Sequence, residues 1–347
     1  MKVTLRDLAQ AAGVSVTTAS RALNDSDHAV SSEARARVLQ MAAEMGYRPN
    51  VSARTLRMDR SFTVGIIADS ISPPFTTDIF EGIENTLNAA GLSSFITTLH
   101  NDTSLQKNAI DALLSRGVDG LIIVDSWESS AIPYLQRLRK PYAFCQRLFG
   151  ISVPNSVIAD NAYGAEQAVA HLLNAGHRRI GFINGKETYY MARDRLQGYI
   201  NAHRRARALL DPQLILPSTW DLDSGYEAAR ELLSLANRPT AIFAANDMLA
   251  VGAIYAAQDL GMDVLNELAI VGYDDQPLAR IIRPNLTTVT YPTYDMGVEA
   301  ARILLRQLDG KQEFMDEVAL KGQLVIRDSC GTRRTPTSSA DATSQDS

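Results

Sequence analysis

Hydrophobic residues at the start of the chain recur at the spacing of helices, which predicts three short helices between residues 4 and 47. The apolar positions are Leu5, Leu8, Ala9 and Ala12 in the first helix and Val38, Met41, Ala42 and Met45 in the third. Gly13 interrupts the first pattern, and Ser15 is a ready N-cap for a second helix over residues 16–24. Residues 50–58 could form a further helix, but helices of fewer than about 12 residues are marginal alone in water.

From residue 62 the pattern changes to short, almost continuous apolar runs separated by helical stripes. The runs are 62–68, 120–124, 180–183, 241–245 and 268–272. Strands that are apolar on both faces belong to parallel sheets covered by helices. The alternation predicts a doubly wound α/β fold. The alternating region is longer than one open sheet usually needs, and its length suits two lobes.

Chain length and charge distribution indicate that the chain consists of a small N-terminal head and a larger body. The chain has 347 residues, enough for two or three domains, and 46% of them are hydrophobic, as in a globular protein. Residues 1–60 hold nine basic and six acidic side chains, whereas the remainder holds 25 basic and 33 acidic ones. A small basic head on an acidic body suits a module that binds nucleic acid, although a chance split of charge would look the same.

The composition also favours an intracellular location. Two cysteines, Cys145 and Cys330, exclude a disulfide-rich scaffold and suit a reducing compartment. The N-terminus has no apolar signal-peptide region, and no apolar run reaches the roughly 18 residues of a membrane span. We therefore expect a soluble, cytoplasmic protein. The tail, residues 331–347, is rich in Ser, Thr, Asp and Ala, which predicts disorder.

Residues 5–24 meet the physical demands of a helix-turn-helix. Ala9 lets two helices cross closely, and Gly13 tolerates the positive φ of the turn. The residues expected to face inward are Val14, Ala19 and Ala22, and those expected to face outward on the second helix are Val16, Thr17, Ser20 and Arg21. In a helix-turn-helix this outward face enters the DNA major groove. The alternative is an ordinary pair of helices in a bundle.

Longer stretches of the chain resemble the lactose/galactose-repressor (LacI/GalR) family of bacterial transcriptional regulators. The stretches in the head are VTLRDLA at 3–9, GVS at 13–15, SRALN at 20–24 and GYRPN at 46–50. Those in the body are GHRRIGFI at 176–183, AND at 245–247, VGYDD at 271–275 and PNLTTV at 284–289. They follow the order of the family and span residues 3–329.

The resemblance implies an all-α helix-turn-helix head plus an α/β body of two lobes, similar to periplasmic sugar-binding proteins and built from doubly wound parallel sheets. We expect the DNA-binding head at residues 1–48, a hinge helix or linker at 49–60, and the effector-binding and dimerisation domain at 61–330. The first lobe should comprise residues 61–160 and 292–320, and the second lobe residues 161–291 and 321–330.

For DNA, the resemblance implies that Val16 and Thr17 select the operator and that Arg21 reads a guanine edge, with a phosphate contact as its alternative. The segment 50–58 resembles the family's hinge helix, which becomes ordered on DNA. Leu56 lies where the family inserts a leucine into the minor groove. The alternative is that Leu56 packs on its own domain. The expected DNA-binding residues are Thr4, Ser15, Val16, Thr17, Thr18, Ser20, Arg21, Asn50, Ala53, Arg54 and Leu56.

For the effector, the resemblance implies a ligand in the cleft between the lobes, beyond the carboxyl ends of the strands. The expected effector-binding residues are Asp69, Phe75, Asp125, Arg147, Arg195, Trp220, Asn246, Asp274 and Tyr291. Carboxylates and amides would bind sugar hydroxyls, and aromatic faces would stack on the sugar ring. The family often has an aspartate before Arg147, but this chain has Gln146. Asp247 could instead be a helix N-cap, and Asp275 could belong to a turn.

We therefore expect a homodimeric transcriptional repressor that binds pseudo-palindromic double-stranded operator DNA and responds to a small-molecule effector, for which a carbohydrate is the first expectation. The alternative is a regulator that needs a purine or nucleoside as co-repressor. A remote alternative is an enzyme or an orphan sugar-binding protein. The five histidines show no HExxH spacing, and the chain lacks a GxGxxG after its first strand and a P-loop, so we expect no catalysis, cofactor or metal.

Overall fold

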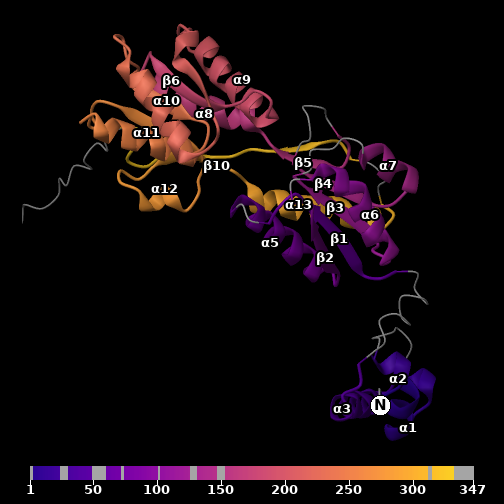
Figure 1. Cartoon of the computed structure of the whole chain (residues 1–347). Helices are drawn as coiled ribbons and strands as arrows, with labels where there is room; N and C mark the ends of the chain where they lie inside the picture. Colours follow the sequence, from indigo (N-terminus) through magenta and orange to yellow (C-terminus); the bar gives the residue numbers. More distant parts are fainter. Residues whose placement is uncertain are drawn as a thin grey trace, which may run out of the picture. The chain divides into compact units, whose positions relative to one another are not determined.

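The computed structural model describes residues 3–23, 30–48, 60–71, 74–100, 102–125, 131–146, 153–311 and 315–331. Contacts divide the chain into two compact units, residues 1–62 and residues 63–347 (Figure 1). The segment 50–58 and the tail from residue 332 lie outside the described residues, so the hinge helix and the disordered tail remain predictions.

The head consists of three helices, α1 (Leu5–Ala11), α2 (Val16–Leu23) and α3 (Ser32–Glu44), as the pattern predicts. Each helix begins at a hydroxyl oxygen that accepts a backbone N–H three residues further on; these caps are Thr4, Ser15 and Ser31. The buried core is formed by Leu8, Ala9, Ala12, Ala19, Ala22, Val38 and Ala42. Gly13, between α1 and α2, has a φ of +65°. The alanines allow the close helix crossing of a helix-turn-helix.

The first lobe of the body is built on a six-stranded sheet in the order β11-β5-β4-β3-β1-β2, with parallel pairing throughout. Its strands are β1 (Thr63–Ala68), β2 (Ser93–Thr98), β3 (Gly120–Val124), β4 (Tyr142–Cys145), β5 (Ser156–Ala159) and β11 (Val318–Leu320). Its helices are α5 (Pro74–Ala89), η1 (Thr103–Leu105), α6 (Gln106–Ser115), α7 (Ala131–Leu138) and α13 (Thr293–Leu308).

The second lobe is built on a six-stranded sheet in the order β12-β10-β9-β8-β6-β7, which is parallel except for β12. Its strands are β6 (Ile180–Gly185), β7 (Ile215–Ser218), β8 (Ala241–Ala244), β9 (Ala269–Asp274), β10 (Thr287–Thr290) and β12 (Leu324–Val325). Its helices are α8 (Asn161–Asn174), α9 (Tyr190–Arg205), η2 (Pro212–Leu214), α10 (Leu222–Ser234), α11 (Asp247–Asp259) and α12 (Leu278–Ile281).

The chain passes from one sheet to the other three times: between β5 and α8, between β10 and α13, and between β11 and β12. Figure 1 shows the result for α13, which follows the second lobe's β10 in the chain but lies among the strands of the first lobe. All five predicted apolar runs form buried strands of the two parallel sheets, β1, β3, β6, β8 and β9. The two-lobed α/β fold is thus confirmed.

Among the described residues, no helix combines the length and apolar character that a membrane span requires.

Candidate functional site

The outer face of α2 offers side chains of different kinds to a partner. Val16, Thr17 and Arg21 are exposed, and Ser20 is half-buried, while the two inward alanines of α2 are buried. Residues four apart on a helix share a face, so Thr17 and Arg21 form one row. The face therefore combines a methyl-bearing surface, a hydroxyl and a guanidinium, the groups that read base edges in a major groove.

Three of the predicted DNA-binding hydroxyls hold the helix starts in place. Thr4 and Asp7 form a capping box, in which Thr4 Oγ1 donates to Asp7 Oδ2 over 2.7 Å and accepts from Asp7 N–H. These hydrogen bonds from Thr4 lower the pKa of Asp7. Ser15 Oγ accepts from Thr18 N–H over 3.0 Å and lies 2.8 Å from Thr18 Oγ1. Contacts of these hydroxyls with phosphates would come in addition to their capping role.

The structure gathers six of the nine predicted effector residues around one cavity of about 250 Å³ in the body. These six are Asp125, Arg195, Trp220, Asn246, Asp274 and Tyr291. The cavity is also lined by Gln146, Tyr189, Met191 and Gln276, which are not among the nine expected effector-binding residues. Asp125 and Gln146 directly follow first-lobe strands, whereas Asp274 and Tyr291 lie at the ends of second-lobe strands. Carboxyl ends of strands from both lobes thus meet at the cavity.

Arg195 is the fixed centre of the second-lobe wall. It is 2% exposed, and its guanidinium donates to Asn161 Oδ1 over 3.0 Å, to the carbonyl of Ala245, and to Asp274 Oδ1 over 3.3 Å. The guanidinium carbon lies 3.8 Å from the ring centroid of Tyr273, a cation–π arrangement. Because these three hydrogen bonds hold the guanidinium in place, Arg195 orients Asp274.

Each lobe contributes one carboxylate to the cavity. Burial raises the pKa of Asp125 to about 6, and the nearby charge of Asp69 acts in the same direction. Burial also raises the pKa of Asp274 to about 6, against the opposing charge of Arg195. Above this pH the ionised form of both carboxyl groups predominates, and it accepts hydrogen bonds from hydroxyl donors such as those of a polyol.

The backbone around the cavity is strained. Asp125, Gln146, Trp220 and Asp274 have φ values of +51°, +85°, +72° and +106°, although none of them is glycine. Such conformations each cost on the order of 1–3 kcal/mol and cluster at functional sites. The strain is a physical reason, independent of any resemblance, to regard this cavity as a candidate ligand-binding site of the body.

Gln146 links the two lobes across the cavity. Its Oε1 accepts hydrogen bonds from the hydroxyls of Tyr190 at 3.3 Å and Tyr291 at 3.4 Å, and its side chain is buried. In the sequence, Gln146 stands out only as the residue before Arg147, where the family often has an aspartate, because the strand β4 that precedes it was not predicted. An aromatic edge contact between Tyr189 and Trp220, whose ring centroids lie 6.1 Å apart, completes the apolar part of the wall.

The other predicted site residues are placed differently or lie outside the described residues. Asp69 is buried after β1 and does not line the cavity. The side chain of Phe75 and the residues Arg147, Asn50, Ala53, Arg54 and Leu56 lie outside the described part of the chain.

The alternative role for Asp247 as a helix N-cap is wrong. Asn246 caps α11, because its Oδ1 accepts from Leu249 N–H over 2.8 Å, and its amide also donates to Trp220 O over 3.0 Å. Asp247 is the first residue of α11 and is fully buried, which raises its pKa well above the usual range. Asp275 follows β9 directly, has a φ of +51°, and pairs with Arg327 and Arg280; its role in a turn stays a prediction.

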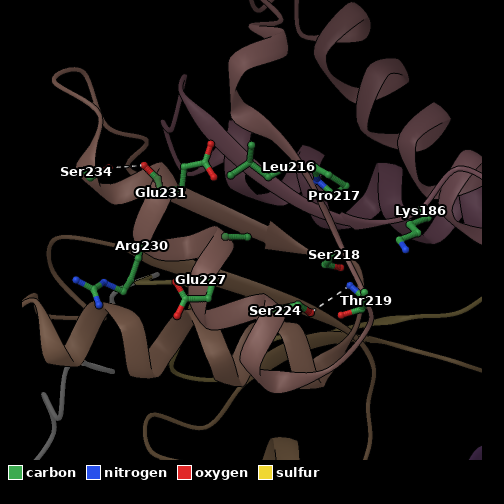
Figure 2. Close-up of a pocket in the computed structure, with 11 residues that line it drawn as sticks. Lys186, Leu216, Pro217, Ser218, Thr219, Ser224, Glu227, Arg230, Glu231 and Ser234 are labelled. Atoms are coloured by element: carbon green, nitrogen blue, oxygen red, sulfur yellow. Dashed lines mark hydrogen bonds between the residues drawn. The ribbon is translucent and has the colours of Figure 1, made fainter.

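A second pocket, of about 650 Å³, lies between β7 and α10 (Figure 2). Figure 2 shows Glu227, Arg230 and Glu231 on the helix side and Ser218 on the strand side. None of the predicted effector residues lines it. In the described part of the chain, no group of three His, Cys, Asp or Glu side chains is arranged to hold a metal ion.

Comparison with known proteins covers both units. Residues 4–50 match the family described as bacterial regulatory proteins, lacI family, and residues 169–330 match the periplasmic binding protein-like domain. The chain is 34% identical to the transcriptional regulator DegA of Bacillus subtilis over 95% of this chain and 98% of that protein. It is 31% identical to the ribose operon repressor of Haemophilus influenzae over 94% and 98%, and 34% identical to the repressor CytR of Escherichia coli K12 over 96% and 97%.

Solved structures are similar over the same length. The lac repressor dimer bound to operator and the anti-inducer ONPF has a TM-score of 0.82 and 29% identity, covering 95% of this chain and 99% of that one. The complex of the transcriptional regulator CelR with cellobiose has a TM-score of 0.69 and 31% identity, covering 94% and 100%.

Proposed function

The chain belongs to the LacI family of bacterial regulatory proteins, and we propose that it is a repressor whose hold on operator DNA is adjusted by a carbohydrate bound between its lobes. The observation that carries the proposal is the combination, in one chain, of an exposed α2 face and a cavity with strained carboxylates from both lobes. A DNA-binding regulator of this kind acts in the cytoplasm, where the bacterial chromosome lies.

In the proposed complex, α2 enters the major groove, and Val16, Thr17 and Arg21 contact base edges. Thr4, Ser15, Thr18 and Ser20 contact phosphates, which position the head without reading sequence. The residues Asn50, Ala53, Arg54 and Leu56 form the hinge contacts, with Leu56 as the minor-groove wedge. This assignment rests on the exposed α2 face for the first set and on the family for the hinge.

We propose a homodimer on a pseudo-palindromic operator, because each head reads one half-site. The edge strand β2 supports pairing of two copies, since Phe95 and Ile96 are 50% and 47% exposed on it. Exposed apolar edge strands are rarely left uncovered. The similar lac repressor structure is a dimer on operator.

The effector proposed here is an uncharged sugar. Hydroxyl groups would donate to Asp125 and Asp274, and the rings of Trp220 and Tyr291 would stack on its C–H faces. A ligand that touches both lobes favours one lobe arrangement over another. Coupling of this kind between two sites is typically about 1–3 kcal/mol. The ribose operon repressor and the cellobiose complex are consistent with such ligands in the family.

A purine or nucleoside co-repressor is the second candidate. The three aromatic side chains of the cavity, Tyr189, Trp220 and Tyr291, would stack on a base as well as on a sugar, and the carboxylates would bind ribose hydroxyls. The sign of the response separates the two proposals, because an inducer weakens operator binding and a co-repressor strengthens it.

The test is a thermal-shift screen of sugars and nucleosides with the full chain, followed by gel shifts on the promoter of its own gene with each compound that stabilises the protein. A sugar that raises Tm and releases the promoter fragment is the expected result. A compound that binds without changing the gel shift would contradict the regulatory proposal.

A further inference from the structure

Asp274 is the last residue of β9, and the chain from Asp274 to Pro277, here called the Asp274 loop, is held by side chains that do not line the cavity. Asp274 and Asp275 are consecutive non-glycine residues with φ values of +106° and +51°. Two adjacent residues in this strained region keep their conformation only where the surroundings determine it. The contacts beneath the loop are therefore part of what gives the cavity its shape.

Asp247 anchors the loop from below. Its Oδ2 accepts the backbone N–H of Gln276 over 2.7 Å, and its Oδ1 accepts the hydroxyl of Thr288 over 2.5 Å. Gly272 on β9 leaves room for this carboxylate, because a Cβ at that position would lie 2.5 Å from Asp247 Oδ1. Both oxygens of a fully buried carboxylate are thus used to fix the loop and its neighbour strand.

Thr288 on β10 joins Asp247 to the loop. Its hydroxyl donates to Asp247 and accepts the backbone N–H of Asp275 over 3.4 Å. The side chain is fully buried. A valine at this position would keep the shape of the side chain but could make neither hydrogen bond.

Arg327 binds the Asp274 loop through its side chain. It donates to Asp275 Oδ1 over 2.5 Å and to the carbonyl of Leu286 over 2.7 Å, and its backbone N–H donates to Thr287 Oγ1 over 2.8 Å. Arg327 lies shortly after β12, on the segment that follows the third passage between the lobes. The Asp274 loop is thereby tied to the segment that follows β12.

We propose that Asp247, Thr288 and Arg327 are positioning residues, which set the ligand affinity of the cavity by holding the Asp274 loop although none of them lines the cavity. The inference rests on the proposed function of the cavity as the effector site. Asp274 needs this support because a carboxylate displaced from Arg195 would no longer face the ligand in a fixed direction.

The experiment compares the full-length chain with Thr288→Val, Thr288→Ser, Arg327→Met and the control Arg179→Met. Arg179 pairs with Asp211 over 2.9 Å, just before the amino end of β6 and hence at the sheet edge opposite the cavity. Hydrogen exchange of the peptide covering residues 274–280 is measured without ligand. Cellobiose and D-ribose are then titrated by calorimetry.

We expect exchange in this peptide to be at least about fivefold faster in Thr288→Val and Arg327→Met, and unchanged in Thr288→Ser and Arg179→Met. Whichever sugar binds the wild type should bind Thr288→Val at least about tenfold more weakly and Thr288→Ser normally. Equal exchange in the valine and serine variants, or equal sugar affinity, overturns the inference. A wild type that binds neither sugar excludes these two compounds as effectors, and the ligand-free exchange comparison still decides this inference.

Discussion

Substitution of Asp274 by asparagine removes one negative charge from the cavity wall while keeping the shape of the side chain. Arg195 should stay in place, because Asn161, the carbonyl of Ala245 and the face of Tyr273 still hold it. A hydrogen bond to a charged group contributes about 1.5–3 kcal/mol. Loss of the charged acceptor should therefore weaken effector binding by about 10- to 150-fold.

The effect on stability should be much smaller than the effect on binding. Asp274 is 20% exposed on its side chain, and the asparagine oxygen can still accept from Arg195. We expect a loss of about 1 kcal/mol of unfolding free energy. The control is Asp211→Asn, which changes the ion pair with Arg179 in the same chemical way but away from the cavity.

The assay is fluorescence anisotropy of a labelled operator fragment, titrated with the compound that the thermal-shift screen identifies. Operator affinity without the compound should stay within about twofold of the wild type, because the head is a compact unit of its own. The concentration of compound that gives half the response should rise by the factor given above. An Asp274→Asn protein that responds at the wild-type concentration would refute the placement of this carboxylate in the effector site.

Three further predictions concern the DNA face, the dimer and pH. Arg21→Ala should lower the affinity ratio between operator and scrambled duplex by the equivalent of about 1–3 kcal/mol, and an unchanged ratio in competition gel shifts would argue against base reading. Phe95→Glu should place a charge on the exposed edge strand and convert dimer to monomer in sedimentation; a persistent dimer would move the interface elsewhere. The pKa values of Asp125 and Asp274 are raised to about 6, and the ionised forms accept ligand hydroxyls, so effector affinity should be full above that pH and fall as pH drops through it. Calorimetry across this range that shows no change would contradict the role of the carboxylates.

The hydrophobic pattern predicts five buried strands, β1, β3, β6, β8 and β9, and misses the buried four-residue strands β4 and β5 as well as more exposed ones. The buried strands are nearly continuous apolar runs because helices cover both faces of their sheets. The edge strand β2 was not predicted, because its side chains are mostly exposed and its sequence, Ser93–Thr98, mixes serine and threonine with two large apolar residues. The strand β12 has only two residues and is defined by its antiparallel pairing with β10, which no local pattern signals.

Part of the cavity could be predicted, because the buried strands that lead to it are recognisable in the sequence. Polar residues directly after buried strands, such as Asp125 and Asp274, are visible in the sequence because carboxyl ends of parallel strands gather at one edge. Tyr189 and Met191 reach the cavity from the start of α9, and no apolar period distinguishes them from core residues. Asn246 and Asp247 are adjacent candidates for one cap, and only the hydrogen bonds to Leu249 and Gln276 separate their roles.

The proposed function requires that ligand binding in the cavity of the body changes the affinity of the head for DNA. It is tested most directly by one anisotropy titration of the chain against its own promoter fragment and a scrambled duplex, each with and without the stabilising compound. We expect a preference for the promoter fragment, and a shift of that affinity alone when the compound is added. Equal affinity for both duplexes, with and without the compound, would contradict it.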